Sequence, residues 1–194
     1  MNYKKLFNSL HPDFFLEKSI QAMPSDWIFT ELVMDLRRDL PNVTSSHCPN
    51  RTTFGEYHGE MAVLRDAVNQ VDEDWVQYFT EGCRYYCAFD SKRIVAFCCL
   101  ADMGIFQGVH IGGLGCVGTI PEYREKGIGL EMVRLATEVL RQDGFDFSWI
   151  HYTHLAHWYM KLGYQPVLQW NSSGILQNNE GDFRCQPAAD SQLF

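Results

Sequence analysis

Blocks of hydrophobic and polar residues are clearest in the second half of the chain. Two runs rich in β-branched and aromatic residues, 84–89 and 94–100, flank Asp90-Ser91-Lys92 and predict a β-hairpin. Residues 109–120 predict a third strand that is unusually rich in glycine and that Pro121 ends. Residues 145–152 and 164–170 predict two more strands. This half of the chain therefore predicts most of the strands of one sheet.

Two helices are predicted between these strands. Residues 127–142 repeat apolar positions every three or four residues, with charged residues on the opposite face, and Asp143-Gly144 ends the pattern. Residues 155–162 predict a shorter helix that ends at Gly163. Strands and helices in alternation indicate a mixed α/β fold.

The first half is harder to interpret. Residues 1–25 predict one or two helical turns, and residues 27–40 fit a helix or a strand equally well. Residues 41–60 are polar, contain Pro and Gly, and predict a long loop, whereas residues 61–79 predict a helix. Near the end of the chain, residues 182–186 are the candidate for one edge strand.

Composition restricts the class of protein. With 194 residues and 46% hydrophobic content, we expect one substantial core, formed by a single domain over residues 1–170, followed by a polar segment at 171–194. A net charge of -8 disfavours nucleic acid as a partner. No run is long enough for a transmembrane helix and the N-terminus lacks the features of a secretory signal, so we expect a cytoplasmic protein without a membrane partner.

The seven cysteines lie mostly within apolar runs and form no CxxC pair. Examples are Cys87, Cys98, Cys99 and Cys116. We interpret them as reduced, buried hydrophobic residues rather than as nucleophiles or metal ligands.

Glycines concentrate where chemistry is expected. Seven of the fifteen glycines lie between positions 108 and 129, and the last of them open the helix at 127–142. The first amides of a helix lack internal partners, and glycine leaves them accessible to a phosphate group. Neither a P-loop nor a GxGxxG fingerprint is present, so a phosphate-bearing cofactor of another class is indicated.

Two motifs make this class specific. The stretch CVGTIPEYREKGIG, 116–129, resembles the coenzyme A-binding motif [RQ]-x-x-G-x-[GA] of the GNAT (GCN5-related N-acetyltransferase) superfamily. Residues 156–164, AHWYMKLGY, resemble the family's second motif, A-x-x-[LF]-Y-x-K-x-G-[FY]. The two motifs occur in the expected order with one strand between them, and the resemblance covers residues 84–170.

The resemblance implies a fold and a site. The expected fold is a mostly antiparallel sheet of six or seven strands, with helices on both faces and a V-shaped cleft where two strands splay apart. Residues 84–170 would bind acetyl-CoA and residues 1–80 would shape the acceptor side. The implied coenzyme-binding residues are Val117, Gly118, Thr119, Arg124, Glu125, Lys126, Gly127, Ile128 and Gly129.

The implied reaction is direct attack of an amine on the thioester, with acetyl-CoA as acyl donor and a small molecule or peptide as acceptor. Tyr159 matches the tyrosine that protonates the departing sulfur. Thr153 stands where many members of the family have Asn, and Trp158 replaces the usual Leu or Phe. The general base stays open: the candidates are Glu122, His151, Tyr152, Glu31, Asp35, Glu56 and Glu60, and the resemblance also allows an ordered water chain in place of a single base.

The sequence also suggests two alternatives to a transferase, a binding module and a zinc protein. A non-catalytic acyl-CoA-binding or regulatory module would share the fold. His151, His154 and His157 have a spacing that could suit zinc on one continuous helix, but a strand-to-helix change within the run is expected to scatter them, so no metal site is predicted. The acceptor amine, the acyl-chain preference and homodimer formation are not fixed by the sequence.

Overall fold

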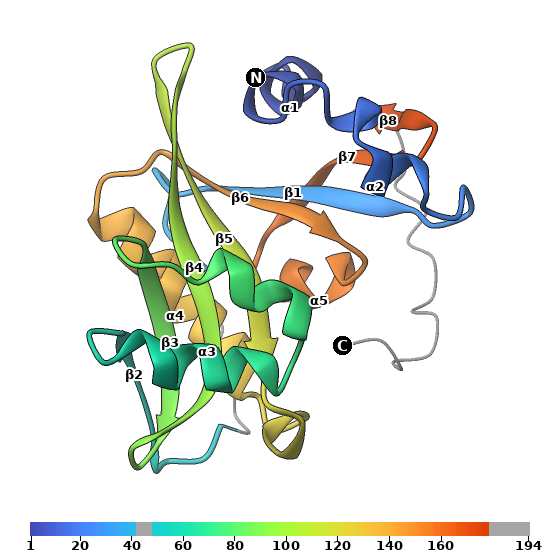
Figure 1. Cartoon of the computed structure of the whole chain (residues 1–194). Coiled ribbons are helices and arrows are strands. Elements are labelled where there is room, and N and C mark those ends of the chain that lie inside the picture. The colour runs from blue at the N-terminus through green and yellow to red at the C-terminus, as the bar shows by residue number, and fades with distance from the viewer. Residues whose placement is uncertain (42–47, 179–194) are drawn as a thin grey trace.

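One twisted sheet organises the molecule (Figure 1). Within residues 1–41 and 48–178, the part of the chain that the computed structural model describes, eight strands form this sheet in the order β2-β3-β4-β5-β6-β1-β7-β8. The strands are β1 Phe29–Asp35, β2 Thr52–Glu56, β3 Arg84–Asp90, β4 Arg93–Phe106, β5 Val109–Thr119, β6 Phe147–Thr153, β7 Gln165–Asn171 and β8 Gly174–Asn178. All neighbours are antiparallel except β5 and β6. The predicted fold class is confirmed, with eight strands rather than six or seven.

The extra strands come from segments whose hydrophobic pattern was weak or ambiguous. β1 lies between β6 and β7, and six of its seven residues are buried. A strand covered on both faces has a continuous apolar run instead of an alternating one, so residues 27–40 did not distinguish strand from helix. The predicted loop at 41–60 is wrong over β2, an edge strand that is only half buried and therefore stays polar.

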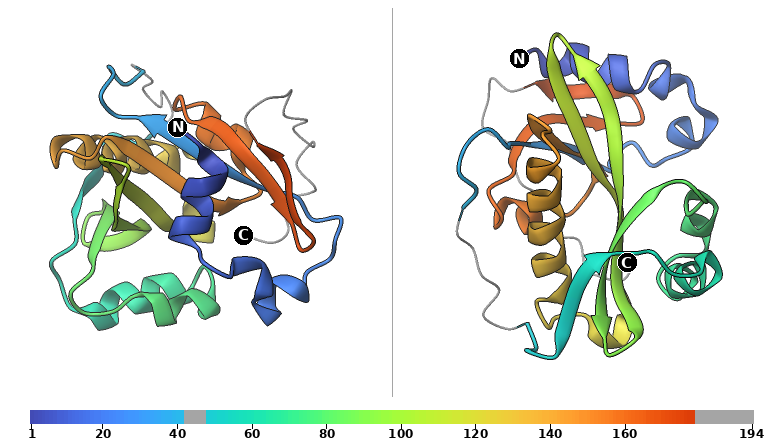
Figure 2. Two further views of the ribbon diagram at one scale, coloured as in Figure 1. Left: turned by 90° about the horizontal axis from the view of Figure 1, so that it is seen from above. Right: turned by 90° about the vertical axis from the view of Figure 1, so that its left-hand side faces the viewer.

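Helices cover both faces of the sheet (Figure 2). They are α1 Tyr3–Leu10, α2 Lys18–Gln21, α3 Met61–Asn69, α4 Ile128–Gln142 and α5 Ala156–Met160, with short 3₁₀ segments η1 Phe14–Leu16, η2 Glu73–Tyr78 and η3 Pro121–Tyr123. α4 packs on one face, and on the other face the N-terminal helices and the α3–η2 pair form two separate covers. The predicted helix at 61–79 is wrong in its middle, where Asp72 accepts a hydrogen bond from the Asp74 N–H and begins η2.

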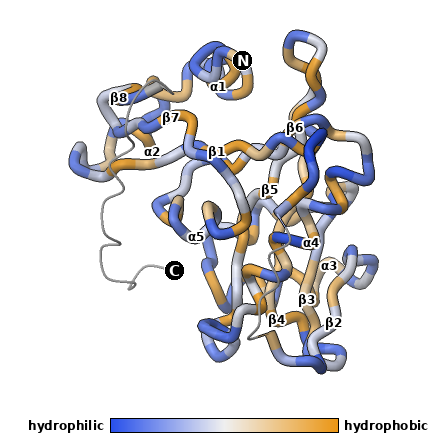
Figure 3. Tube along the Cα trace, turned by 180° about the vertical axis from the view of Figure 1, so that it is seen from behind, coloured by the Kyte–Doolittle hydropathy of each residue, from blue (hydrophilic) through white to orange (hydrophobic). Residues whose placement is uncertain are grey.

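Three hydrophobic clusters correspond to these three contacts. One lies between α4, α5 and the sheet, the second under α1–α2, and the third under α3–η2. Hydrophobic positions follow the strands, and hydrophilic ones follow the loops and outer helix surfaces (Figure 3). The second cluster includes Ile111 of β5 and Trp149 of β6, whereas Cys116, further along β5, packs against the third.

Two further expectations concern the ends and the cysteines. β8 pairs with β7 at the sheet edge, whereas the edge strand predicted at 182–186 lies outside the described residues.

The cysteines in the described part are free thiols, and burial raises the pKa of Cys87 to about 12. None of the described helices has both the length and the apolar character needed to cross a membrane.

Candidate active site

The sheet splits between its two parallel strands. β5 and β6 pair only from Ile111–Gly113 to Phe147–Trp149. Beyond these residues β5 continues to pair with β4, and β6 continues to pair with β1. The remainder of β5 therefore has one edge of backbone N–H and C=O groups facing a gap. The predicted V-shaped separation is confirmed.

A β-bulge lies on the β5 side of this gap. Gly115 pairs with Cys99 and Gly118 pairs with Phe97, so Cys116 and Val117 lie opposite a single residue of β4. Cys116 has φ 46°, a left-handed conformation that is uncommon for a residue with a side chain. This bulge changes the direction of the backbone at the gap.

The N-terminus of α4 lies at the open end of the gap. Gly127 is its N-cap, with φ 71° and no side-chain hydrogen bond to the helix. The first hydrogen bond from the helix to this cap is donated by Glu131, which leaves the amides of residues 128–130 without partners inside the helix. Arg124 Nε donates to the Thr119 carbonyl at 3.1 Å and holds the connecting loop against the end of β5. Such an array of free amides at a positive dipole end suits a phosphate group.

A cavity of about 410 Å³ occupies the separation. Its lining combines β5, the loop before α4, the start of α4, α5 and two residues from α3–η2: Val71, Trp75, Val117, Gly118, Thr119, Tyr123, Arg124, Glu125, Gly127, Ile128, Gly129, Leu130, Leu155, Trp158, Tyr159 and Lys161. Nine of the ten residues implied by the motifs are therefore brought together. The tenth, Lys126, is not part of the lining, since its ammonium donates to the Glu122 carbonyl at 2.7 Å and lies over the Tyr123 ring.

Sequence reasoning missed the part of the cavity wall that comes from the other face of the sheet. Val71 and Trp75 belong to the α3–η2 segment, whereas α5 packs with α4 on the opposite face. The cavity thus reaches both faces through the gap. Nothing in the local sequence around Val71 or Trp75 distinguishes them from ordinary core residues.

Two glycines of the cluster are also required by packing. A Cβ at Gly118 would lie 2.5 Å from the Phe97 ring, and a Cβ at Gly129 would lie 2.6 Å from Thr119 Oγ1. Close approach of neighbouring groups, as well as access for a ligand, therefore explains why glycine occupies these positions.

Tyr159 projects from α5 into the cavity wall. Its side chain is buried, and this burial raises its pKa far above that of a free phenol. No described residue hydrogen-bonds its hydroxyl group. Thr153, which replaces the usual Asn, accepts a hydrogen bond from the Leu155 N–H at 2.9 Å in the turn that precedes α5.

A buried carboxylate lies on the other side of the sheet. Glu31 of β1 is 0% exposed and accepts hydrogen bonds from Trp149 Nε1 at 2.8 Å, Trp170 Nε1 at 2.7 Å and the Tyr152 N–H at 3.1 Å. His151 Nδ1 lies 2.9 Å from its Oε2. The sequence named Glu31 and His151 separately as candidate bases, but it contained no signal that they meet, since 120 positions separate them.

The three histidines of HYTHLAH have different surroundings. His151 contacts Glu31, His154 Nδ1 lies 3.1 Å from the Ile28 carbonyl, and His157 is exposed on α5. Among the described residues, no group of three His, Cys, Asp or Glu side chains is arranged to hold a metal ion.

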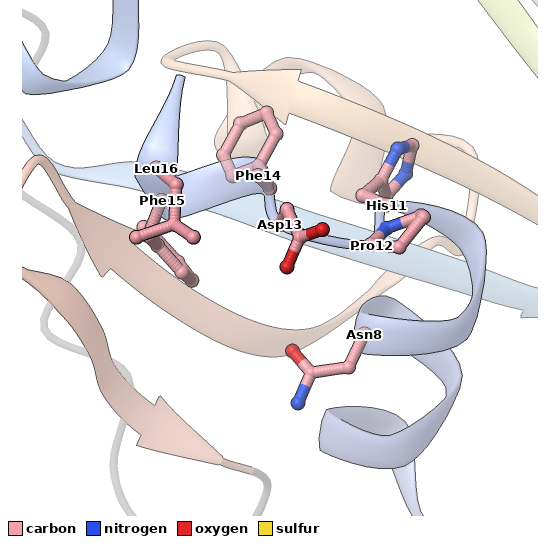
Figure 4. A pocket seen from close by; sticks show the side chains of 7 residues that line it. All are labelled: Asn8, His11, Pro12, Asp13, Phe14, Phe15 and Leu16. Atoms are coloured by element: carbon pink, nitrogen blue, oxygen red, sulfur yellow. The ribbon is translucent and has the colours of Figure 1, made fainter. Parts of the chain in front are cut away.

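A second hollow lies in the N-terminal cover (Figure 4). It has a volume of about 410 Å³ and is formed entirely by one short segment, with lining residues Asn8, His11, Pro12, Asp13, Phe14, Phe15 and Leu16. It shares no residue with the cleft between β5 and α5. One of its lining residues, His11, stacks its ring on the ring of His151.

Comparison with known families agrees with the fold and with the position of the cleft. The Acetyltransferase (GNAT) family profile matches residues 48–164, more than half of the chain. The chain belongs to this family.

Individual relatives are distant. Over 62 residues the chain is 31% identical to an amino-acid acetyltransferase of Edwardsiella ictaluri (strain 93-146), a match that covers 32% of this chain and 14% of that enzyme. A glucosamine N-acetyltransferase region of a fungal multi-domain GH3 β-N-acetylglucosaminidase superposes with a TM-score of 0.61 at 19% identity, over 75% of this chain and 20% of that one. A GCN5-related N-acetyltransferase from Sphaerobacter thermophilus gives a TM-score of 0.57 at 16% identity, over 74% and 50% of the two chains. The chain thus spans half or less of these proteins, and the two structures support the fold alone.

Proposed function

We propose that this protein transfers an acetyl group from acetyl-CoA to the amine of a small molecule or peptide. The observation that carries the proposal is the alignment of the β5 bulge, the free amides of α4 and Tyr159 around one cavity. The membership of the GNAT family supports the same conclusion. The acetyl group enters the site as the thioester of coenzyme A.

Different residues of the cleft bind different parts of the coenzyme. The amides of residues 128–130 and the Arg124 guanidinium hold the pyrophosphate, because they combine unpaired donors with positive charge. Along the gap, the free backbone edge from Val117 to Thr119 hydrogen-bonds the extended pantetheine arm much as a neighbouring strand would. Glu125, Gly127, Ile128 and Gly129 shape the entry, and Lys126 steers the phosphates from outside the cavity.

Tyr159 supplies the proton for the sulfur that leaves. Burial keeps its phenol protonated at all physiological pH values, so the hydroxyl is available as a donor next to the arm. The acceptor approaches from the face that carries the N-terminal helices and α3–η2, because the cavity opens to that face beside Val71 and Trp75. In this proposal residues 1–80 form the acceptor side of the same domain.

The test is release of coenzyme A thiol from acetyl-CoA in the presence of polyamines, aminoglycosides, amino acids and short peptides. Wild type is compared with Tyr159→Phe, which removes only the hydroxyl group, and with Tyr3→Phe as a matched control outside the cleft. We expect turnover with one class of amine, a loss of about 100-fold in kcat for Tyr159→Phe and no change for Tyr3→Phe. Binding of acetyl-CoA without turnover of any amine would favour a non-catalytic acyl-CoA-binding module instead.

A further inference from the structure

The buried carboxyl group of Glu31 is surrounded by hydrogen-bond donors. Indole N–H and backbone N–H groups can only donate hydrogen bonds, and each carboxylate oxygen accepts at least one of them. Both oxygens therefore act as acceptors. Trp149, Trp170 and Tyr152 thus satisfy the buried carboxyl oxygens, and no described Lys or Arg is paired with them.

This carboxylate fixes the tautomer of His151. Nδ1 lies 2.9 Å and 3.0 Å from the two oxygens of Glu31, so Nδ1 carries the proton and donates it. In the neutral ring, Nε2 then carries the lone pair. Nε2 has no hydrogen-bonding partner in the described part of the chain, and the His151 side chain is 25% exposed to solvent.

His151 lies on β6 just beyond the residues that pair with β5, at the start of the gap. Trp149 is the last residue of β6 that pairs with β5, and its side chain lies on the face of the N-terminal helices. Because side chains alternate along a strand, His151 is the next one on that face and the first beyond the split. On β5 the corresponding position is Gly115, where a Cβ would meet only Cys99 Cβ at 3.9 Å. No other side chain therefore packs closely over Gly115, at the inner end of the gap.

The N-terminal segment that covers this face of the sheet contributes a second imidazole next to His151. His11, at the end of α1, stacks on His151 with the ring centroids 3.8 Å apart and the planes 13° from parallel. Burial, together with the neighbouring His151, lowers the pKa of His11 to about 4, so His11 stays neutral. The titratable groups in contact with His151 are thus Glu31 from β1, neutral His11 and the adjacent Tyr152 of β6. The other rings that contact it, Phe7, Phe14 and Trp170, do not ionise.

We infer that His151 is the general base of the transferase and that Glu31 is its positioning residue. The inference rests on the proposed function. The amine nitrogen forms a bond to the thioester carbonyl carbon and gives a proton to His151 Nε2. The C–S bond breaks, its electron pair leaves with sulfur, and sulfur takes a proton from Tyr159. Solvent returns the proton from His151 to Tyr159, so each turnover gives one amide and one thiol.

The experiment uses the full-length protein and the amine that the wild type acetylates. His151→Asn retains an N–H donor for Glu31 but lacks the second ring nitrogen, and His151→Gln is made beside it so that the result does not depend on the folding of one variant. His157→Asn is the matched control, since His157 is exposed on α5 and outside the cavity lining. Glu31→Gln tests the positioning role. For each variant, kcat is measured from pH 6.5 to 9.5, and the Kd of acetyl-CoA is measured by calorimetry.

We expect both His151 variants to lose about 100-fold or more in kcat at pH 7. The loss should shrink as the pH rises, because hydroxide then accepts the proton in place of the missing imidazole. Acetyl-CoA affinity should stay within a few fold of wild type, His157→Asn should match wild type, and Glu31→Gln should follow the His151 variants.

Two results would overturn the inference. If the loss in the His151 variants is the same at every pH, or if there is none, His151 is not the base, although wild-type turnover would leave the proposed function intact. If the wild type itself acetylates no amine, the proposed function fails and the role of His151 fails with it.

Discussion

The α4 end of the gap between β5 and β6 is built from the backbone of one short segment, whereas the inner end at His151, which lies outside the cavity lining, is built from side chains of three distant segments. At the first end, residues 116–129 supply a bulge, a left-handed glycine and a row of free amides. At the second, His11, Glu31 and His151 meet only because β1 inserts between β6 and β7. One end therefore depends on local conformation and the other on the tertiary fold.

The two ends also differ in the free-energy cost of a substitution. The amides at the start of α4 face a hydrated cavity, so they cost little when no ligand is bound. The Glu31 carboxyl group is buried, and removing it leaves several donors without acceptors. We therefore expect substitutions at the α4 end to change ligand affinity and substitutions at the His151 end to change stability as well.

The largest expected effect is on Glu31→Ala. This variant removes the acceptor of the indole N–H groups of Trp149 and Trp170 and of the Tyr152 amide, each of which costs about 1–3 kcal/mol when buried without a partner. We expect the free energy of unfolding to fall by about 4 kcal/mol, as measured by urea denaturation. A loss below about 1 kcal/mol would show that the cluster does not support the fold.

A smaller effect is expected at the α4 end. Arg124 lines the cavity, whereas the Lys126 ammonium is bonded to Glu122 outside the lining. Arg124→Ala should weaken acetyl-CoA binding about tenfold, which corresponds to about 1.4 kcal/mol, and Lys126→Ala should weaken it about twofold. Calorimetry on both variants measures the difference. Equal losses would mean that long-range charge, rather than contact, determines affinity there.

A third effect concerns the pH dependence of stability at His11. Its pKa is about 4 in the folded protein and about 6.5 in an unfolded chain. As the pH falls from 6.5 towards 4, the unfolded chain binds a proton that the folded protein does not, so the stability present above pH 6.5 is progressively lost. His11→Phe preserves the stacked ring and removes this titration.

We expect the melting temperature of His11→Phe to equal or slightly exceed that of wild type at pH 7, since His11 Nε2 is buried without a hydrogen-bonding partner. Between pH 7 and pH 4.5 the variant should lose fewer degrees than wild type. Parallel melting curves over this range would contradict the neutral state assigned to His11.

The same difference between the two ends explains what the sequence predicted. The glycines before α4 and the AHWYMKLGY segment are local patterns, and the structure assembles nine of the ten residues that they implied around one cavity. Local patterns did not identify β1 as a strand, because burial on both faces removes the alternation. Without β1, neither the contact between Glu31 and His151 nor the stacking of His11 can be derived, because both require a sheet order that only the tertiary fold specifies.

The central claim is that coenzyme A binds in the gap between β5 and β6, and calorimetric titration with acetyl-CoA tests it most directly. Gly129→Trp and Val117→Trp each place a large ring in this gap from opposite walls, and a thermal melt verifies that each variant is folded. The account predicts binding of one acetyl-CoA per chain in the wild type and none that is measurable in either folded variant. Equal binding by the wild type and both variants, or no binding by the wild type, would contradict it.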